Sequence, residues 1–178
     1  MQNTNLNSLR SPLVPDGYKI RTYQRGDETS WKKIIASSFG SIGTDQSIER
    51  IINTENFDPK SLFFITNDNL PIGTAWASLR PEGEQNTGYV EMVGVAPDHQ
   101  GKRLGALLVL CTLHYIREKG LSKAALFASA DNLPAIKTYL RTGFRPIYLK
   151  RHDEQLWNKV FTNLKVQENH DQNCLSPM

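Results

Sequence analysis

Several features that mark other classes of protein are missing from this sequence. Only two of its 178 residues are cysteines, Cys111 and Cys174, and two are too few for a disulfide framework. No apolar run is long enough to cross a membrane. The segment Met1–Arg10 also lacks the apolar core of a secretory signal peptide. We therefore expect a cytoplasmic protein that does not associate with membranes.

Strong charge and metal-binding patterns are missing as well. The formal net charge is only +3, which is too small to indicate nucleic-acid binding but suits a polyanionic ligand. The four histidines show no metal-ligand spacing, so no metal is expected. No serine or cysteine stands in a nucleophile-elbow pattern. A reaction through a covalent enzyme intermediate is therefore not expected.

The length and composition favour a single soluble domain. A chain of 178 residues with 39% hydrophobic and 22% charged residues can bury one real core. Residues 1–17 are rich in Asn, Ser and Pro and are expected to form a loose N-terminal arm. Residues 166–178 are polar and are expected to form a flexible tail. The domain would span 18–165, as a monomer or a homodimer.

Hydrophobic periodicity predicts the elements of the first half of the chain. They are a strand at Tyr18–Tyr23, a helix at Glu28–Ser38 with Asp27 as its N-cap, a helix at Thr44–Asn53, and a hairpin of Ser61–Thr66 with Pro71–Leu79. Another strand, Tyr89–Val95, follows a polar loop. These strands are consecutive and antiparallel, so the first crossover helix comes only after Val95.

The sequence after Tyr89–Val95 has the order that makes an anion site. The turn Ala96–His99 is followed by Gln100-Gly-Lys-Arg-Leu-Gly-Ala106 and then by an apolar helical run. The first amides of a helix lack internal acceptors and carry partial positive charge, so they bind phosphates. Neither a Walker A loop nor a dinucleotide-binding fingerprint fits the glycine spacing. The expected ligand is therefore a phosphate or pyrophosphate that is bound neither by a Walker A loop nor by a dinucleotide-binding loop.

Two motifs in this region resemble the GNAT superfamily of N-acetyltransferases. The family's acetyl-coenzyme A loop reads Gln/Arg-x-x-Gly-x-Gly/Ala, and this chain has Gln100, Arg103 and Gly105 at its fixed positions. Arg103 departs from the pattern, and we expect it to be tolerated with a negative φ. The segment from Asn132 to Phe144 is similar to the family's Asn-x-x-Ala-x-x-x-Tyr-x-x-x-Gly-Phe signature at every fixed position.

The resemblance implies a fold, a cosubstrate and a reaction. The fold would be α+β or α/β, with a mixed, mostly antiparallel sheet, a splayed central parallel pair and flanking helices. Acetyl-coenzyme A would donate an acetyl group to a primary amine, small or peptidic, by direct attack in a ternary complex. Residues 130–139 are similar to mycothiol synthase-like members of the family, which carry two such domains.

The same resemblance implies the residues that hold the cosubstrate. A main-chain amide near Val93 would bind the thioester carbonyl, and Gly94 would permit close approach. The full set of cofactor-binding residues implied is Val93, Gly94, Val95, Gln100, Gly101, Lys102, Arg103, Leu104, Gly105, Ala106, Asn132, Ala135 and Tyr139. Asn132 would also serve as a helix N-cap, a role compatible with ligand contact.

Glu91 is the candidate general base. Strict alternation places Tyr89, Glu91, Val93 and Val95 on one face of the strand and Val90, Met92 and Gly94 on the other. A carboxylate in so apolar a strand is costly unless it is paired or used. The alternative, which stays open, is a structural ion pair with an arginine such as Arg80. Glu84 and His99 are weaker candidates for the base.

Tyr139 is the candidate general acid. Asn132 and Tyr139 are two helical turns apart, so they share one face at a separation of about 10 Å. A phenol has a pKa near that of a leaving thiolate and can protonate it. The alternative is a core tyrosine with a satisfied hydroxyl.

The remaining pattern completes the expected fold and leaves two other functions open. A buried helix begins at Leu104, a strand at Ala124 lies parallel to Tyr89–Val95, a strand follows at Phe144–Leu149, and Asp153 caps a last amphipathic helix. That helix could cover the sheet or form a dimer contact. The alternative functions are a non-catalytic acyl-coenzyme A sensor and an acetyltransferase for protein N-termini or lysines.

Overall fold

A mixed sheet forms the centre of the molecule. The computed structural model describes residues 1–39, 48–55, 57–80 and 83–165. Within them the strands follow the order β1–β6–β5–β4–β3–β2. They are Gln2–Asn3 (β1), Tyr18–Thr22 (β2), Leu62–Asn67 (β3), Leu70–Ser78 (β4), Thr87–Val95 (β5) and Lys123–Ala125 (β6). Only β5 and β6 pair in parallel, which confirms the predicted mixed, mostly antiparallel sheet with one parallel pair.

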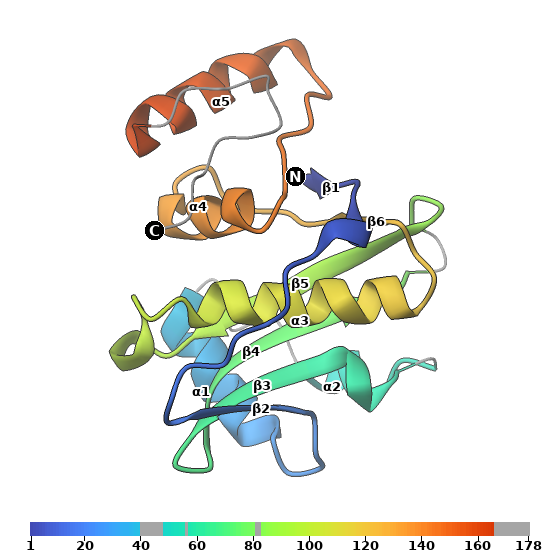
Figure 1. Ribbon diagram of the computed structural model, residues 1–178, viewed down its shortest axis with the longest axis vertical. Helices are drawn as coiled ribbons and strands as arrows, with labels where there is room; N and C mark the ends of the chain where they lie inside the picture. Colours follow the sequence, from blue (N-terminus) through green and yellow to red (C-terminus); the bar gives the residue numbers. More distant parts are fainter. Residues whose placement is uncertain (40–47, 56, 81–82, 166–178) are drawn as a thin grey trace.

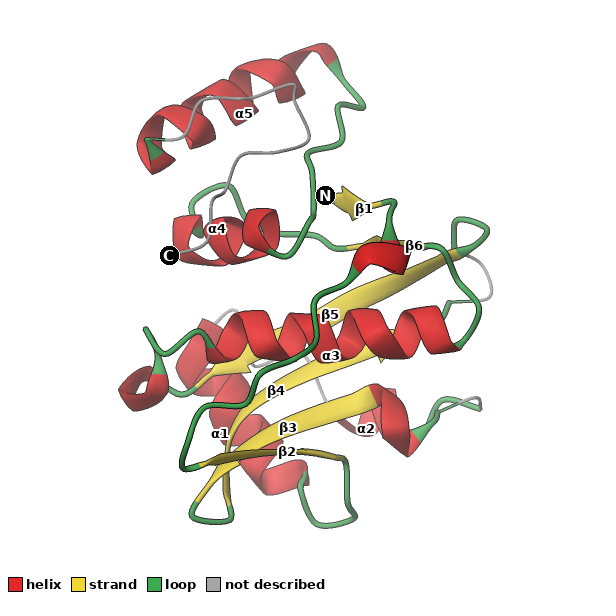
Figure 2. Ribbon diagram, in the orientation of Figure 1, coloured by secondary structure: helices red, strands yellow, loops and turns green. Residues whose placement is uncertain are grey.

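Helices cover both faces of this sheet (Figures 1 and 2). They are Glu28–Phe39 (α1), Ile48–Ile52 (α2), Leu104–Glu118 (α3), Leu133–Arg141 (α4) and Arg151–Leu164 (α5), with short 3₁₀ turns at Leu6–Ser8 (η1), Pro59–Ser61 (η3) and Pro97–His99 (η4). The part of the predicted helix at 44–47 lies outside the described residues, as does the predicted tail at 166–178. No helix in the described part of the chain is long and apolar enough to cross a membrane.

The core lies on both sides of the sheet because α1, α2 and α3 bury apolar faces against it. On one side α3 packs through Leu108, Leu113 and Ile116, and it is largely buried, as predicted. On the other side α1 and α2 pack through Trp31 and Ile48. The predicted C-terminal helix is also present, and α5 packs on α4 rather than on the sheet.

The prediction of a loose arm is wrong for the first residues of the chain. Gln2 and Asn3 pair with β6 as its outer neighbour, and Leu6 is buried under α3 with 1% of its surface exposed. The Asn3 side chain donates to Thr142 O across 3.1 Å. Asparagine-rich composition indicated a loop, but here the asparagine satisfies a buried carbonyl, and tertiary contacts decide the structure.

The predicted strand at Phe144–Leu149 is also wrong. Only Arg145 forms a bridge, with Gln2, and Leu149 is 82% exposed. β1 already occupies the outer edge of β6. Pro146 has no N–H to donate, so a ladder cannot continue through it.

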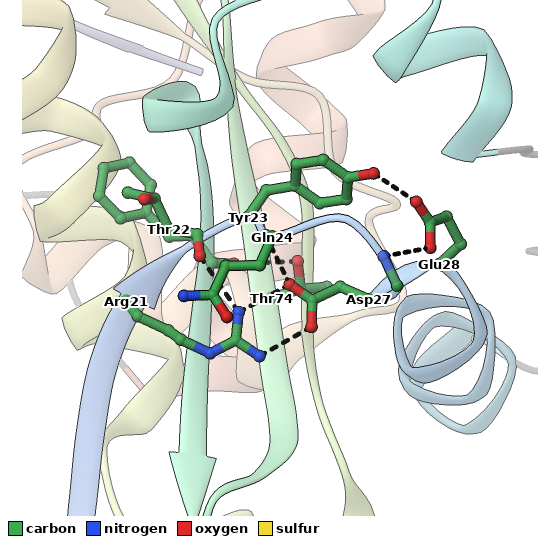
Figure 3. Close-up of polar contacts among 9 residues, drawn as sticks. Arg21, Thr22, Tyr23, Gln24, Asp27, Glu28 and Thr74 are labelled. Atoms are coloured by element: carbon green, nitrogen blue, oxygen red, sulfur yellow. Dashed lines mark hydrogen bonds and ion pairs between the residues drawn. The ribbon is translucent and has the colours of Figure 1, made fainter.

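The start of α1 is fixed by a network of charges (Figure 3). Both guanidinium nitrogens of Arg21 donate to Asp27, across 2.6 and 2.7 Å, and the Gln24 amide donates to the same carboxylate across 2.8 Å. Asp27 was predicted as the N-cap, yet its carboxylate binds the preceding loop instead. Glu28 accepts from Tyr23 and from the Gly26 amide. This network sets the angle at which α1 leaves β2.

We expect Asp27→Asn to destabilise the fold by about 2–3 kcal/mol at neutral pH. Burial alone raises the pKa of Asp27, but the hydrogen bonds from Arg21 and Gln24 outweigh it and hold that pKa below its ordinary value. The stabilisation is therefore present above the unfolded pKa of about 4 and is lost as pH falls through the folded pKa.

Urea unfolding at about pH 7 and about pH 3 measures this effect. The difference in free energy of unfolding between wild type and Asp27→Asn should be smaller at the lower pH. Glu154→Gln, on the exposed surface of α5, is the matched control and should cost under about 0.5 kcal/mol. If this difference does not change with pH, the ionised carboxylate of Asp27 does not stabilise the fold as described.

Candidate active site

The central parallel pair separates soon after it forms. β5 and β6 are in register only at Thr87–Tyr89 against Lys123–Ala125, although β5 continues to Val95. Beyond Tyr89, β4 is the only described strand that pairs with β5. The backbone groups on the other side of Val90–Val95 therefore face no strand. Such groups need water or a ligand as partners, which is the predicted setting for an extended cosubstrate.

A β-bulge in β5 changes which residues share a face. Thr74 lies opposite Gly94 and Trp76 opposite Glu91, so Met92 and Val93 together oppose one residue of β4. Met92 takes the left-handed conformation with a φ of 52°, as bulged residues can.

The predicted alternation is therefore wrong beyond Glu91. Met92 packs with α1 and α2, whereas Val93 packs with α3. Glu91 lies opposite Trp76, which also packs on the α1 side. The candidate base and Met92 therefore lie on the same face, toward α1 and α2.

The loop before α3 presents free amides. Leu107 is the first residue of the helix whose amide donates inside it, to Arg103 O across 3.2 Å. No described carbonyl accepts from the amides of Leu104, Gly105 or Ala106. The space beside Gly105 is open, since an added Cβ would meet only Thr138 Cγ2 of α4, at 4.0 Å. These amides and the helix dipole form an anion cradle, as predicted from the sequence.

Arg103 takes the conformation that the glycine of the motif would take. Its φ is 61°, in the left-handed region, so the expectation of a negative φ is wrong. The loop turns sharply between η4 and α3, and Gly101 is also left-handed, with a φ of 77°. A Cβ in this region costs about 1–2 kcal/mol. The loop therefore holds its arginine in a strained backbone conformation.

Tyr139 lies beside the point where β5 and β6 separate. Its ring is 8% exposed and packs with Val90 of β5, with Leu126 just after β6, and edge-on to Phe144 with ring centroids 6.1 Å apart. Among the described residues none hydrogen-bonds its hydroxyl. Burial raises the pKa of Tyr139 to about 12. The phenol is therefore protonated at neutral pH and has a proton to give.

Asn132 has the N-cap role that the sequence allowed. Its side chain accepts from the amide of Ala135 across 3.2 Å and so begins α4. The carboxamide nitrogen is not needed for this bond. Capping by Asn132 therefore leaves donors for a ligand at the same end of α4.

Glu91 forms the ion pair that the sequence offered as an alternative. Its carboxylate pairs with Arg80, and the two side chains are 17% and 42% exposed. The guanidinium also lies over the Tyr89 ring, 4.9 Å from its centroid. The weaker candidates are engaged elsewhere: Glu84 binds Lys123, and His99 binds Tyr18. Glu91 is thus the partly open carboxylate at the bulge.

The C-terminal end of α1 contributes a residue that sequence reasoning missed. Ser38 Oγ donates to Val95 O across 3.3 Å. A Cβ on Gly94 would come within 2.9 Å of Ser38 Oγ. Gly94 therefore lets α1 approach the end of β5, a different close approach from the one predicted. No motif spacing links Ser38 to Val95, so only the fold reveals the contact.

The site holds no metal-binding cluster. Within the described parts of the chain, no three His, Cys, Asp or Glu side chains gather closely enough to hold an ion. The chemistry available comes from main-chain amides, a buried phenol and one carboxylate. A strand with unpaired backbone groups that leads into an anion cradle suits an extended ligand that carries phosphate groups at one end.

Comparison with known proteins gives the family. Residues 29–144 match the model of the acetyltransferase (GNAT) family, and the chain belongs to that family. It is 33% identical over 148 residues to a mycothiol acetyltransferase of Nocardia farcinica, covering 77% of this chain and 48% of the relative. A mycothiol acetyltransferase of Thermomonospora curvata is 35% identical over 144 residues, 75% of this chain and 48% of the relative. The chain thus spans about half the length of these curated relatives.

Solved structures support the same fold. A GCN5-related N-acetyltransferase from Sphaerobacter thermophilus has a TM-score of 0.65 at 19% identity and covers 81% of this chain and 46% of that one. An aminoglycoside N-acetyltransferase in complex with coenzyme A has a TM-score of 0.61 at 21% identity. The match covers 78% of this chain and 99% of that one. The fold class predicted from the sequence is confirmed.

Glycine should fit position 103 better than any residue with a Cβ. We expect Arg103→Gly to be more stable than Arg103→Ala by about 1 kcal/mol, because both remove the side chain but only glycine relieves the left-handed strain. Urea unfolding of the two variants measures the difference. If alanine is as stable as glycine, Arg103 does not hold a positive φ in solution.

Proposed function

We propose that this protein is an N-acetyltransferase that moves the acetyl group of acetyl-coenzyme A to a primary amine in a ternary complex. The observation that carries the proposal is the run of unpaired backbone beyond Tyr89 on β5, which ends at the free amides of Leu104–Ala106. The diphosphate would bind those amides. The pantetheine arm would pair with β5 as a strand does, and it would place the thioester near Val93.

The residues present fit the proton transfers that the reaction needs. The amine nitrogen attacks the carbonyl carbon, the carbon–sulfur bond breaks, and the leaving thiolate takes the phenolic proton of Tyr139. Glu91 accepts the proton that the amine loses, directly or through water. In the resting protein Glu91 is paired with Arg80. The hydroxyl of Tyr139, which has no hydrogen-bond partner among the described residues, is available to the leaving sulfur.

The acceptor we propose is a small-molecule amine. The names of the mycothiol and aminoglycoside acetyltransferases above point to small amines. A peptide amine is the second candidate, since a ribosomal-protein alanine N-acetyltransferase from Escherichia coli shares the fold with a TM-score of 0.58. A cytoplasmic location and reaction without a metal complete the proposal.

Tyr139→Phe should reduce kcat about a hundredfold or more while the Kd for coenzyme A changes less than about twofold. The hydroxyl has no hydrogen bond within the described residues, so its loss should leave the fold intact. Steady-state kinetics and calorimetry measure the two quantities. Tyr115→Phe removes a phenol near the C-terminal end of α3 and is the matched control.

Two results would overturn this role of Tyr139. One is a kcat close to that of wild type, which would make it a core tyrosine. The other is binding of coenzyme A with no acetyl transfer by wild type to any of a broad amine panel, which would favour the sensor.

Glu91→Gln should remove the acidic limb of the pH dependence of kcat/KM and lower its value at neutral pH about a hundredfold. The amide keeps the shape of the side chain but cannot accept a proton. Rates measured across the pH range test this, with Glu84→Gln as the control on a carboxylate paired with Lys123. An unchanged pH profile would leave Glu91 as a structural partner of Arg80.

A further inference from the structure

Three side chains from separate parts of the chain meet beside the anion cradle. Tyr18 opens β2, His99 ends η4, and Lys102 lies in the loop before α3. Lys102 Nζ donates to Tyr18 Oη across 3.0 Å, and Tyr18 Oη lies 3.0 Å from His99 Nδ1. The two rings meet edge to face with centroids 5.8 Å apart, and Lys102 Nζ lies 5.7 Å from the tyrosine centroid. These contacts hold the ammonium in one place.

No carboxylate of the described residues neutralises the charge of this ammonium. Among the ion pairs of the described residues none involves Lys102, whose partner is a neutral phenol. Fixing a lysine side chain costs conformational entropy. A lysine ordered in advance, with its charge still available, suits an anion that arrives from solution.

His99 can supply a second donor. An ammonium has no acceptor site, so Lys102 donates to Tyr18 Oη. Tyr18 Oη and His99 Nδ1 share a hydrogen bond whose direction depends on the imidazole tautomer. In the tautomer in which the phenol donates to Nδ1, the Nε2–H of His99 is a donor beside the loop.

We propose that Tyr18, His99 and Lys102 form a subsite for the 3′-phosphate of acetyl-coenzyme A, and this rests on the acetyltransferase function proposed above. Coenzyme A carries two separate anionic groups, a diphosphate and a 3′-monophosphate, joined through one ribose. When the diphosphate binds the amides of Leu104–Ala106, the 3′-phosphate lies beside the same loop, near Lys102. Lys102 and His99 donate to it, and Tyr18 is a positioning residue that holds Lys102.

The test compares coenzyme A with dephospho-coenzyme A, which lacks only the 3′-phosphate. Calorimetry on the full chain gives the Kd of each for wild type, Lys102→Gln and Tyr18→Phe. Both ligands are measured on the same protein, so a partly unfolded variant cancels in the ratio of the two. Lys19→Gln is the control, since Lys19 is an exposed lysine next to Tyr18 on β2 whose loss changes the net charge equally.

Wild type should bind coenzyme A roughly tenfold to a hundredfold more tightly than dephospho-coenzyme A, as one or two charge-assisted hydrogen bonds provide. Lys102→Gln should bring the ratio of the two Kd values close to one, because it weakens the binding of coenzyme A and leaves that of dephospho-coenzyme A unchanged. Tyr18→Phe keeps the aromatic ring but removes the hydroxyl that holds Lys102. Its Kd ratio should therefore fall between those of wild type and Lys102→Gln. Lys19→Gln should keep the ratio of wild type.

Two results would overturn the subsite. One is equal binding of both ligands by wild type. The other is a Lys102→Gln variant that loses affinity for both ligands by the same factor, since that places Lys102 on the diphosphate. If neither ligand binds wild type, the proposed function itself fails.

Discussion

The structure depends on the loss of pairing between β5 and β6 after Tyr89. A central strand normally pairs on both sides, and its buried amides and carbonyls are then satisfied. Here the pairing ends with Tyr89 opposite Ala125, while β5 continues for six further residues to Val95. The fold therefore contains a row of polar groups that needs a ligand or water. A chain-like molecule with amide groups of its own meets that need.

The separation is held open by groups on the far side of β6. The amide of Leu126 donates to Met1 O across 3.0 Å, so the chain after β6 is tied to the N-terminal segment rather than to β5. Asn3 in turn holds the end of α4 through Thr142 O, and its side chain comes within 2.8 Å of the position a Cβ would take on Gly143. Tyr139 packs in one cluster with Val90 and Leu126, beside the opening between the two strands. The polar N-terminal segment is thus a structural part of the site.

The sequence revealed β2 to β6, the main helices and the cradle, because periodicity and helix-start signals act locally. It misplaced Val93 because one inserted residue in an apolar run leaves no mark on composition, yet it reverses every later side chain. The φ of Arg103 was missed because an arginine can take a glycine's conformation when the surrounding loop is fixed at both ends. Ser38 and Tyr18 were missed because their partners lie 57 and 81 residues away.

The two halves of the proposed site differ in how far they depend on side chains. In the cosubstrate half, main-chain groups of β5 and of Leu104–Ala106 would bind the pantetheine arm and the diphosphate, and side chains such as Lys102 would contribute at its edge. The acceptor half lies on the face of Trp76, Glu91 and Met92, toward α1 and α2, where side chains define the surface. Substitutions on that face can change which amine is bound while the amides of Leu104–Ala106 stay in place. Such a division lets one fold keep a single acyl donor while its acceptors diversify.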